Sequence, residues 1–316
     1  MGALGGEPPR SEEPPAQPEA GDRPEALYYQ AAQQEVGRVL AAAKAGTGVA
    51  VGALQRIAAG LARAVTGGDD LLLQAMENDG PKMDLPRHMV NVAVFAVKIG
   101  QGSGCREEEL PWLALAACLH DVGMLAVPHG LLDKPAALTA EEMALVRRHP
   151  EVGFRLLQPL GPEFEWVANV ALQEHEREDG TGYPKGLRGE AIHDYAKIVG
   201  LADVYEAMTH TRAYRPTRVA SAVVKELIGA ERRRFPDRIL KGLIRGLSTA
   251  PVGSLVRLNS NEVGRVVATN PAFPLRPVVE VITGAKGERL DEPRRVDLST
   301  NTLLYITDAS ATRTRI

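Results

Sequence analysis

The sequence predicts a mainly α-helical protein with a short N-terminal helical segment and a small C-terminal β appendage. Two observations support this prediction. Apolar residues recur at helical spacing between Pro24 and Leu247, and they change to the two-residue spacing of strands after Pro251. The chain has 316 residues, of which 44% are hydrophobic and 24% are charged. A chain of this size and composition can bury a full hydrophobic core.

The net charge and the cysteine content argue against a nucleic-acid-binding, membrane-bound or disulfide-rich protein. The formal net charge of -3 gives no electrostatic reason to bind nucleic-acid polymers or an anionic membrane. The only cysteines are Cys105 and Cys118, which form no zinc-type spacing and no disulfide framework. The apolar run from Leu110 to Leu132 is interrupted by histidines and an aspartate, so it predicts a buried core helix and not a membrane span. With no secretory signal visible, we expect a cytoplasmic protein.

Two segments precede the main domain. Residues 1–23 are rich in proline and glycine and hold few core-forming residues, so we expect them to be disordered. Residues 24–76 are predicted to form two helices, separated by Gly46 and Gly48. This segment is too short and too simple for a sensory domain. We expect it to pack against the main domain or against a second subunit, which would make a homodimer.

Residues 77–248 are predicted to form the main domain. Its first helix begins near Pro86, a residue suited to a first helical turn, and carries His88. Asp84 lies four residues before His88. Considered alone, Asp84 would be a helix-capping carboxylate and His88 an ordinary, partly buried histidine.

Two further helices carry polar residues at apolar, buried positions, where contact with water does not explain their presence. A helix over about 107–119 ends at His120 and Asp121. An adjacent imidazole and carboxylate at the end of a buried helix are costly unless they are paired or bind a metal. A later helix over about 192–208 carries Asp203 on an otherwise small and apolar surface.

Between these helices the sequence predicts a capped helical pair over residues 139–159. Thr139 and Glu142 have the spacing of a capping box. His149 is followed by Pro150, which disfavours helical geometry at the preceding residue. His149 is therefore expected at a junction between helices, where ligands are often found.

The most polar stretch, from Glu174 to Pro184, follows a helix predicted over about 164–173. It holds one histidine, four carboxylates, two glycines and a tyrosine in eleven residues. This composition is too polar and too flexible for a hydrophobic core, so we expect a functional loop. Arg212 and Arg215 place two guanidinium groups just beyond the helix that carries the later aspartate.

Residues 249–316 are predicted to form the β appendage. The apolar runs 256–258 and 263–267 flank a polar turn, which is typical of a hairpin. Further strands are predicted over residues 278–282 and 303–306.

The His120-Asp121 pair and the Gly182-Tyr183-Pro184 motif resemble the HD-GYP family, the metal-dependent branch of the HD phosphohydrolases that hydrolyses cyclic di-GMP. The resemblance covers roughly residues 77–248 and implies an HD-type helical bundle. It implies two or three divalent metal ions, with Fe or Mn expected. Mixed imidazole and carboxylate ligands also suit these metals better than Mg alone. The implied metal ligands are His88, His120, Asp121, His149, His175 and Asp203.

The same resemblance implies roles for further residues. Asp121 would bridge two metals and act in catalysis, and Asp84 stands where some members carry a glutamate that supports a third metal. The implied contacts to cyclic di-GMP are Tyr183, Arg212 and Arg215, with Gly182 and Pro184 shaping the loop. The reaction would release linear pGpG or GMP.

Two positions depart from the family pattern. Met124 stands where the family usually has a lysine, and Glu174 stands where it usually has a histidine. The site is therefore two charge units more negative, and one unit pair at about 4 Å is worth on the order of 4 kcal/mol at an effective dielectric near 20. Glu174 can still coordinate a metal through oxygen.

Three functions stay open after these departures: a cyclic di-GMP phosphodiesterase, a cyclic di-GMP receptor or interaction module, and a phosphodiesterase for another cyclic nucleotide. The remaining histidines have no partners suggested by spacing and are expected to be surface or structural residues: His129, His193 and His210.

Overall fold

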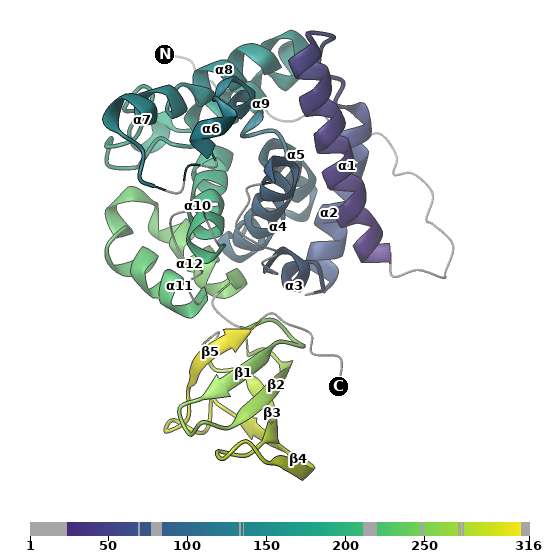
Figure 1. Ribbon diagram of the computed structural model, residues 1–316, viewed down its shortest axis with the longest axis vertical. Coiled ribbons are helices and arrows are strands. Elements are labelled where there is room, and N and C mark those ends of the chain that lie inside the picture. Colours follow the sequence, from purple (N-terminus) through teal and green to yellow (C-terminus); the bar gives the residue numbers. More distant parts are fainter. Residues whose placement is uncertain are drawn as a thin grey trace.

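The computed structural model describes residues 24–68, 70–76, 84–132, 134, 136–210, 220–247, 250–270, 273 and 275–310. Over these residues the protein is a helical bundle with a small antiparallel sheet at one end (Figure 1). The predicted fold class, including the HD-type bundle, is confirmed. Three predictions concern residues outside the described part of the chain: the disorder of residues 1–23 and the substrate contacts of Arg212 and Arg215.

The N-terminal segment consists of α1 (Pro24–Ala45), α2 (Gly52–Gly67) and α3 (Asp70–Met76). The two predicted helices and the break at Gly46 and Gly48 are present as α1 and α2, but α3 was missed. A helix of 7 residues has too few turns to show a helical period, although three of its leucines are buried. α1 packs on α4, and α2 packs on α5, so the segment covers the main domain.

The centre of the bundle is formed by α4 (Leu85–Ser103), α5 (Leu110–Ala117) and α10 (Asp194–Thr209), with α12 (Asp237–Leu247) packed along α4. α4 is buried all round over residues 88–97. A helix that is apolar on every face is stable only inside the protein. The short η1 helix (Glu107–Glu109) precedes α5, and α11 (Ala220–Gly229) and the η6 turn (Arg232–Arg234) precede α12.

One stretch of the described residues, Glu107–Ala126, is long and apolar enough to cross a membrane by length and composition alone. In the structure, 72% of an 18-residue apolar segment within this stretch is buried inside the protein. It comprises η1, α5 and the η2 turn (Val122–Ala126), so the predicted position in the core is confirmed.

The remaining helices form the upper left of Figure 1. They are α6 (His129–Leu132), α7 (Ala140–Val146), α8 (His149–Leu157), η3 (Gln158–Leu160), η4 (Pro162–Phe164), α9 (Glu165–Gln173) and η5 (Gly189–Ala191). The predicted capping box before α7 is present, because Glu142 N donates to Thr139 Oγ1 at 3.3 Å and Thr139 N donates to Glu142 Oε2 at 2.8 Å. α8 begins at His149, at the predicted junction between two helices.

The C-terminal sheet has the strand order β4-β3-β2-β1-β5, and the paired strands run antiparallel. Its strands are β1 (Leu255–Leu258), β2 (Val263–Ala268), β3 (Val278–Thr283), β4 (Arg289–Asp297) and β5 (Ile306–Ser310). The sheet has a core of its own, formed by Ala250, Val256, Leu258, Val266, Val279, Val281, Val296 and Leu298. The division into domains at residue 249 stays a prediction.

The predicted hairpin and third strand are present, but two strand predictions differ from the structure. The strand predicted over residues 303–306 was wrong, because β5 contains only Ile306 of that run. β4 was missed because Val296 is the one buried residue in its sequence, so no apolar alternation marks it.

Candidate metal centre

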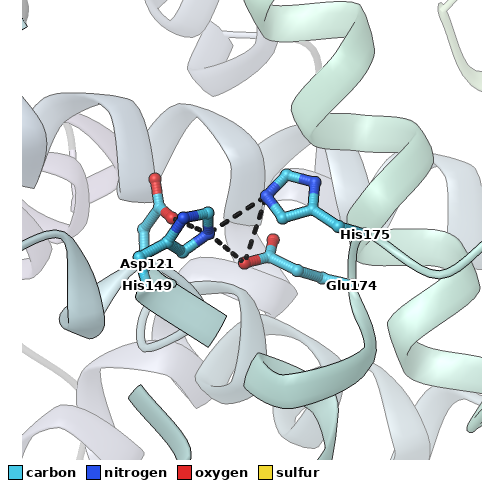
Figure 2. Close-up of side chains that lie close together, drawn as sticks. All are labelled: Asp121, His149, Glu174 and His175. Atoms are coloured by element: carbon cyan, nitrogen blue, oxygen red, sulfur yellow. Dashed lines mark hydrogen bonds and ion pairs between the residues drawn. The ribbon is translucent and has the colours of Figure 1, made fainter. Parts of the chain in front are cut away.

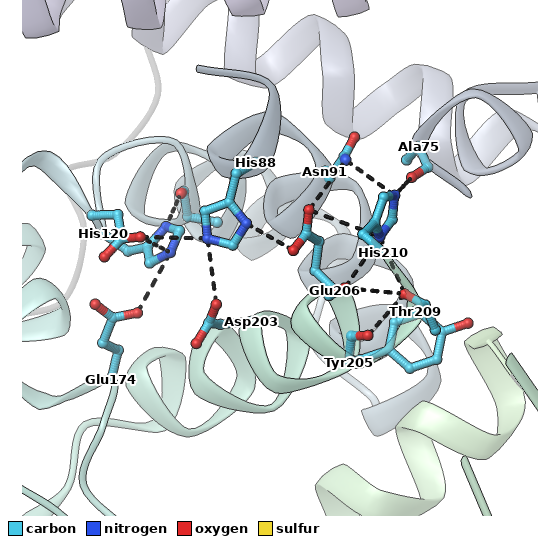
Figure 3. Close-up of polar contacts among 12 residues, drawn as sticks. Ala75, His88, Asn91, His120, Glu174, Asp203, Tyr205, Glu206, Thr209 and His210 are labelled. Atoms are coloured by element: carbon cyan, nitrogen blue, oxygen red, sulfur yellow. Dashed lines mark hydrogen bonds and ion pairs between the residues drawn. The ribbon is translucent and has the colours of Figure 1, made fainter. Parts of the chain in front are cut away.

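Two groups of side chains in the described part of the chain are placed to hold metal ions. The His149 group consists of Asp121, His149, Glu174 and His175 (Figure 2). The His88 group consists of His88, His120 and Asp203 (Figure 3). Within each group the ligand atoms lie within 4.8 Å of one another.

The two groups contain seven of the eight predicted metal ligands. The eighth, Asp84, is exposed at the residue before α4 and belongs to neither group. Its backbone carbonyl accepts a hydrogen bond from His88 N at 2.9 Å. Asp84 therefore occupies the capping position before α4, as its alternative role predicts. Its side chain makes no capping hydrogen bond.

Helix ends bring most of the ligands together. His120 and Asp121 follow the end of α5 after Cys118 and Leu119, and His149 opens α8. Glu174 and His175 follow the C-terminal end of α9. His88 and Asp203 lie within α4 and α10, two helices that pack against each other.

Asp121 faces both groups. Its Oδ1 lies 3.2 Å from His149 Nε2, while its Oδ2 lies 3.4 Å from His88 Nε2 and 3.7 Å from His120 Nε2. The two oxygens of one carboxylate therefore point to ligands of different groups. This is the arrangement that a bridging ligand between two metal ions requires.

Glu174 also spans the two groups. Its Oε1 lies 3.5 Å from His149 Nε2, and its Oε2 lies 3.6 Å from His120 Nε2. The side chain is completely buried, and neither oxygen has a hydrogen-bond partner among the described residues. An unpartnered buried carboxylate is costly, so these oxygens fit a site that a cation completes. The same holds for the unpartnered Nε2 atom of His120.

The second nitrogen of two ligand histidines is held by a backbone carbonyl. His120 Nδ1 donates to the Ala117 carbonyl at 2.7 Å, and His149 Nδ1 donates to the Val146 carbonyl at 2.8 Å. A proton fixed on Nδ1 leaves the lone pair on Nε2 for a metal. This donor set of imidazoles and carboxylates therefore fits divalent ions.

Mutual attraction shifts the pKa values of the buried groups. Burial raises the pKa of Asp121 and Asp203, but the neighbouring histidines outweigh it and hold both values well below the ordinary range. Burial lowers the pKa of His149, but Asp121 and Glu174 raise it to about 9. Without metal, the carboxylates are thus ionised and the imidazole holds a proton. A bound cation takes the place of that proton.

The Gly182-Tyr183-Pro184 loop covers the His149 group. The Tyr183 ring stacks on the His175 ring, with centroids 4.7 Å apart and planes 17° apart. The guanidinium of Arg147 lies over the Tyr183 ring, 5.2 Å from its centroid. The sequence reasoning did not single out Arg147, and the available signal was its place two residues before His149. Arg147 is exposed, so a cation stands at the solvent side of the cluster.

A buried glutamate and a half-buried arginine hold the backbone of the loop. Glu176 accepts hydrogen bonds from the backbone nitrogens of Lys185 at 2.7 Å and Leu187 at 2.9 Å. Arg177 donates from Nη1 to the carbonyl oxygens of Glu174 and Glu176, both at 2.9 Å. Glu176 therefore shapes the loop and is no ligand of either group. The sequence could not separate this role from metal binding.

Close backbone packing sets the distance between Asp121 and His149. A Cβ atom at Gly123 would overlap the carbonyl oxygen of His149 and lie 2.5 Å from the nitrogen of Gly153. The η2 turn therefore touches α8 backbone to backbone. Met124, at the position where the family carries a lysine, is buried in the same turn.

Comparisons with known proteins agree with this geometry. Residues 73–239 match the family model described as HD domain, and residues 255–316 match that of a KOW domain associated with HD domain. A cyclic di-GMP phosphodiesterase of Pseudomonas aeruginosa is 37% identical over 217 residues, which are 67% of this chain and 51% of that protein. A 3'3'-cGAMP-specific phosphodiesterase of Vibrio cholerae is 32% identical over 158 residues, 50% of this chain and 30% of that protein. The chain thus spans about half of the first relative and 30% of the second.

A solved structure supports the fold. The HDG"Y"P protein from Bdellovibrio bacteriovorus superimposes with a TM-score of 0.58 at 20% sequence identity. The match covers 71% of this chain and 72% of that one. At this level of identity the likeness concerns the fold alone.

Proposed function

Because the chain belongs to the HD domain family, in its HD-GYP branch, we propose that it is a phosphodiesterase that hydrolyses cyclic di-GMP to linear pGpG or GMP. The observation that carries the proposal is the position of Asp121 between the two groups of ligands. HD domain phosphohydrolases bind divalent metals, and the two groups supply the ligands for them.

The described residues support two metal ions, one in each group, with Fe or Mn as the proposed metals. A third ion would need Asp84, which is exposed and outside both groups. Bound divalent ions would lower the pKa of water and offset charge on the phosphate oxygens. Asp121 and Glu174 would each help to hold both ions, and Glu174 would supply a carboxylate where the family usually has a histidine.

The chain's own residues then bind and orient the substrate. Asp121 accepts a hydrogen bond from the attacking water and orients it toward phosphorus. Tyr183 stacks on His175 at the open side of the cluster and offers its edge and hydroxyl to the nucleotide. Arg147 holds a phosphate beside that ring, together with Arg212 and Arg215, which follow α10 in the sequence. Gly182 and Pro184 shape the turn that places the tyrosine.

A second candidate function is a cyclic di-GMP receptor or interaction module without turnover. Met124 favours it, because this buried neutral side chain cannot hold a phosphate as a lysine does. Glu174 adds a negative charge at the centre of the cluster. A third candidate is hydrolysis of another cyclic dinucleotide, since one relative of this chain is named for 3'3'-cGAMP.

One experiment separates the three candidates. The full chain is reconstituted anaerobically with Fe(II) or Mn(II) and incubated with cyclic di-GMP or 3'3'-cGAMP, and products are followed by chromatography and binding by calorimetry. We expect pGpG or GMP from cyclic di-GMP, with turnover lowered about 10³-fold in Asp121→Ala. Tight binding without product would favour the receptor, and faster cleavage of 3'3'-cGAMP would favour the third candidate.

The setting of this reaction is also part of the proposal. We place it in the cytoplasm, because Cys105 and Cys118 are both free and the substrate is a bacterial second messenger. We propose no binding to nucleic-acid polymers or a membrane. A homodimer through the N-terminal helices remains a proposal, and light scattering that gives a monomer at high protein concentration would rule it out.

A further inference from the structure

A chain of buried polar contacts runs from His88 away from the metal centre. His88 Nδ1 lies 2.9 Å from Glu206 Oε2 on the side opposite the ligand cluster (Figure 3). The other ligand histidines with a described Nδ1 partner, His120 and His149, are held by backbone carbonyls of their own neighbourhood. Nδ1 of His88 instead lies beside a charged side chain of α10, one turn after Asp203, in an ion pair without hydrogen-bond geometry.

Glu206 is tied to Asn91, which lies one turn after His88 on α4. Asn91 Nδ2 donates to Glu206 Oε1 at 3.5 Å, the long end of the hydrogen-bond range. Asn91 Oδ1 accepts a hydrogen bond from the Tyr29 hydroxyl of α1. All three side chains are buried: Tyr29 is 3% exposed, Asn91 1% and Glu206 4%.

A second branch reaches α3. The backbone nitrogen of His210 donates to Glu206 O at 3.0 Å, and its ring Nε2 donates to the Ala75 carbonyl at 2.9 Å. His210 is buried, and these bonds give it the structural role expected from the sequence. α1 and α3 are thus both fixed to the residues that stand behind His88.

The hydrogen bonds of this chain all donate in the direction from α1 to Glu206. The Tyr29 hydroxyl donates to Asn91, and Asn91 donates to Glu206. A carboxylate beside Nδ1 favours the tautomer with the proton on that nitrogen, which leaves Nε2 for a metal. An apolar contact would hold α1 against α4 equally well. Polar groups at this depth are costly unless each is partnered, so the chain couples the position of α1 to the orientation of His88.

We propose that Glu206 is a positioning residue for His88, and that docking of the N-terminal helices α1 and α3 strengthens metal binding in the His88 group through Asn91 and His210. The inference rests on the metal centre of the proposed function. It makes the N-terminal segment a regulatory element: whatever displaces α1 weakens the metal centre, and loss of metal loosens α1. Such coupling is reciprocal by thermodynamic necessity.

The test measures Co(II) binding by the full, metal-free chain through its visible absorption. Glu206→Gln keeps the shape and the hydrogen-bonding atoms but removes the charge, and we expect it to weaken the affected site about 10- to 100-fold and to change its spectrum. Tyr29→Phe removes one hydroxyl far from the ligands, and we expect about a two- to tenfold loss, the range of one hydrogen bond. Tyr28→Phe removes a hydroxyl from the same helix outside the chain of contacts and should match the wild type.

Hydrogen exchange supplies a second readout that a purely structural role would leave unchanged. Co(II) should slow amide exchange in residues 24–45 of the wild type, and less so in Glu206→Gln. The proposal is overturned if Glu206→Gln and Tyr29→Phe bind Co(II) as the wild type does, or if Tyr28→Phe weakens binding as much as Tyr29→Phe. A wild type that binds no Co(II) removes the metal centre and the proposal together. If Co(II) binding and α1 are coupled but the protein does not hydrolyse cyclic di-GMP, this inference still holds. Only the proposed phosphodiesterase activity is then excluded.

Discussion

The His149 group and the His88 group differ in what stands behind them. The His149 group is covered by the Tyr183 ring and an exposed arginine, so its outer side faces solvent. The His88 group is set between α4 and α10, and Glu206 connects it to the helices at the N-terminus. Under the proposed function, the His149 group is the half of the centre that would meet the substrate, and the His88 group is the half that is fixed to the fold.

Removing Asp121 tests whether the two groups form one centre. Since Asp121 faces both groups, we expect Asp121→Ala to lose at least one metal ion per chain and to lower turnover by about 10³-fold. Elemental analysis and the chromatographic assay give the two numbers. Asp179→Ala, which changes a carboxylate bonded to Thr181 in the same loop region, is the matched control and should keep both metals. Full metal content in Asp121→Ala would show that the groups bind independently.

Changing Glu174 tests whether the negative charge of this carboxylate weakens substrate binding. Glu174→His restores the usual family residue and removes one negative charge, so we expect the KM for cyclic di-GMP to fall about tenfold. Steady-state kinetics and elemental analysis on the same preparations check this. Glu174→Gln removes the charge with little change in shape and separates charge from ligand geometry. An unchanged KM in both variants would contradict the charge argument.

Removing Arg147 tests whether the His149 group is the side that meets the substrate. The guanidinium lies over the Tyr183 ring, so we expect Arg147→Ala to raise the KM about three- to tenfold with little change in kcat or metal content. Arg148→Ala removes the neighbouring exposed arginine and is the matched control. Equal effects of the two substitutions would mean that only general charge attraction is at work.

The pH dependence of the metal-free protein gives the smallest effect. The pKa of His149 in the folded protein is about 9, above its ordinary value of 6.5, because Asp121 and Glu174 outweigh burial. The stabilisation from this proton is complete below pH 6.5 and is lost as the pH rises through 9. We therefore expect the thermal midpoint of metal-free protein to fall between pH 7 and 9, measured by calorimetry. Metal-loaded protein should not show this fall, because the metal replaces the proton. A flat profile without metal would show that the His149 proton is not held.

Seven of the eight ligands that the family resemblance implies lie together in the structure, and part of their signal is local. His120 and Asp121 are adjacent shortly after α5, and Glu174 and His175 are adjacent at the end of α9. The fold class was predictable for the same reason, since helical and strand periods are read over short windows. The short helix α3 and the charged strand β4 carry too few apolar repeats to be recognised.

The residues that support the ligands were harder to predict. Glu206 and Asn91 each lie one turn from a ligand on the same helix, which is a weak signal visible in the sequence. Their meeting depends on how α4 crosses α10, and no spacing within either helix contains that information. Arg147 carries no signal beyond its place near His149, because the Tyr183 ring that it covers comes from a distant loop.

The close packing at Gly123 limits how this centre can be copied into another protein. A design that transplants only the metal-binding side chains would leave out the residue that lets η2 touch α8. Even alanine at this position would push the turn away from α8, and the 3.2 Å separation between Asp121 Oδ1 and His149 Nε2 would grow. Programs that score variants by chemical similarity alone would rank Gly123→Ala as mild. In this fold we expect the substitution to lower metal affinity, although residue 123 has no side chain that could bind a metal.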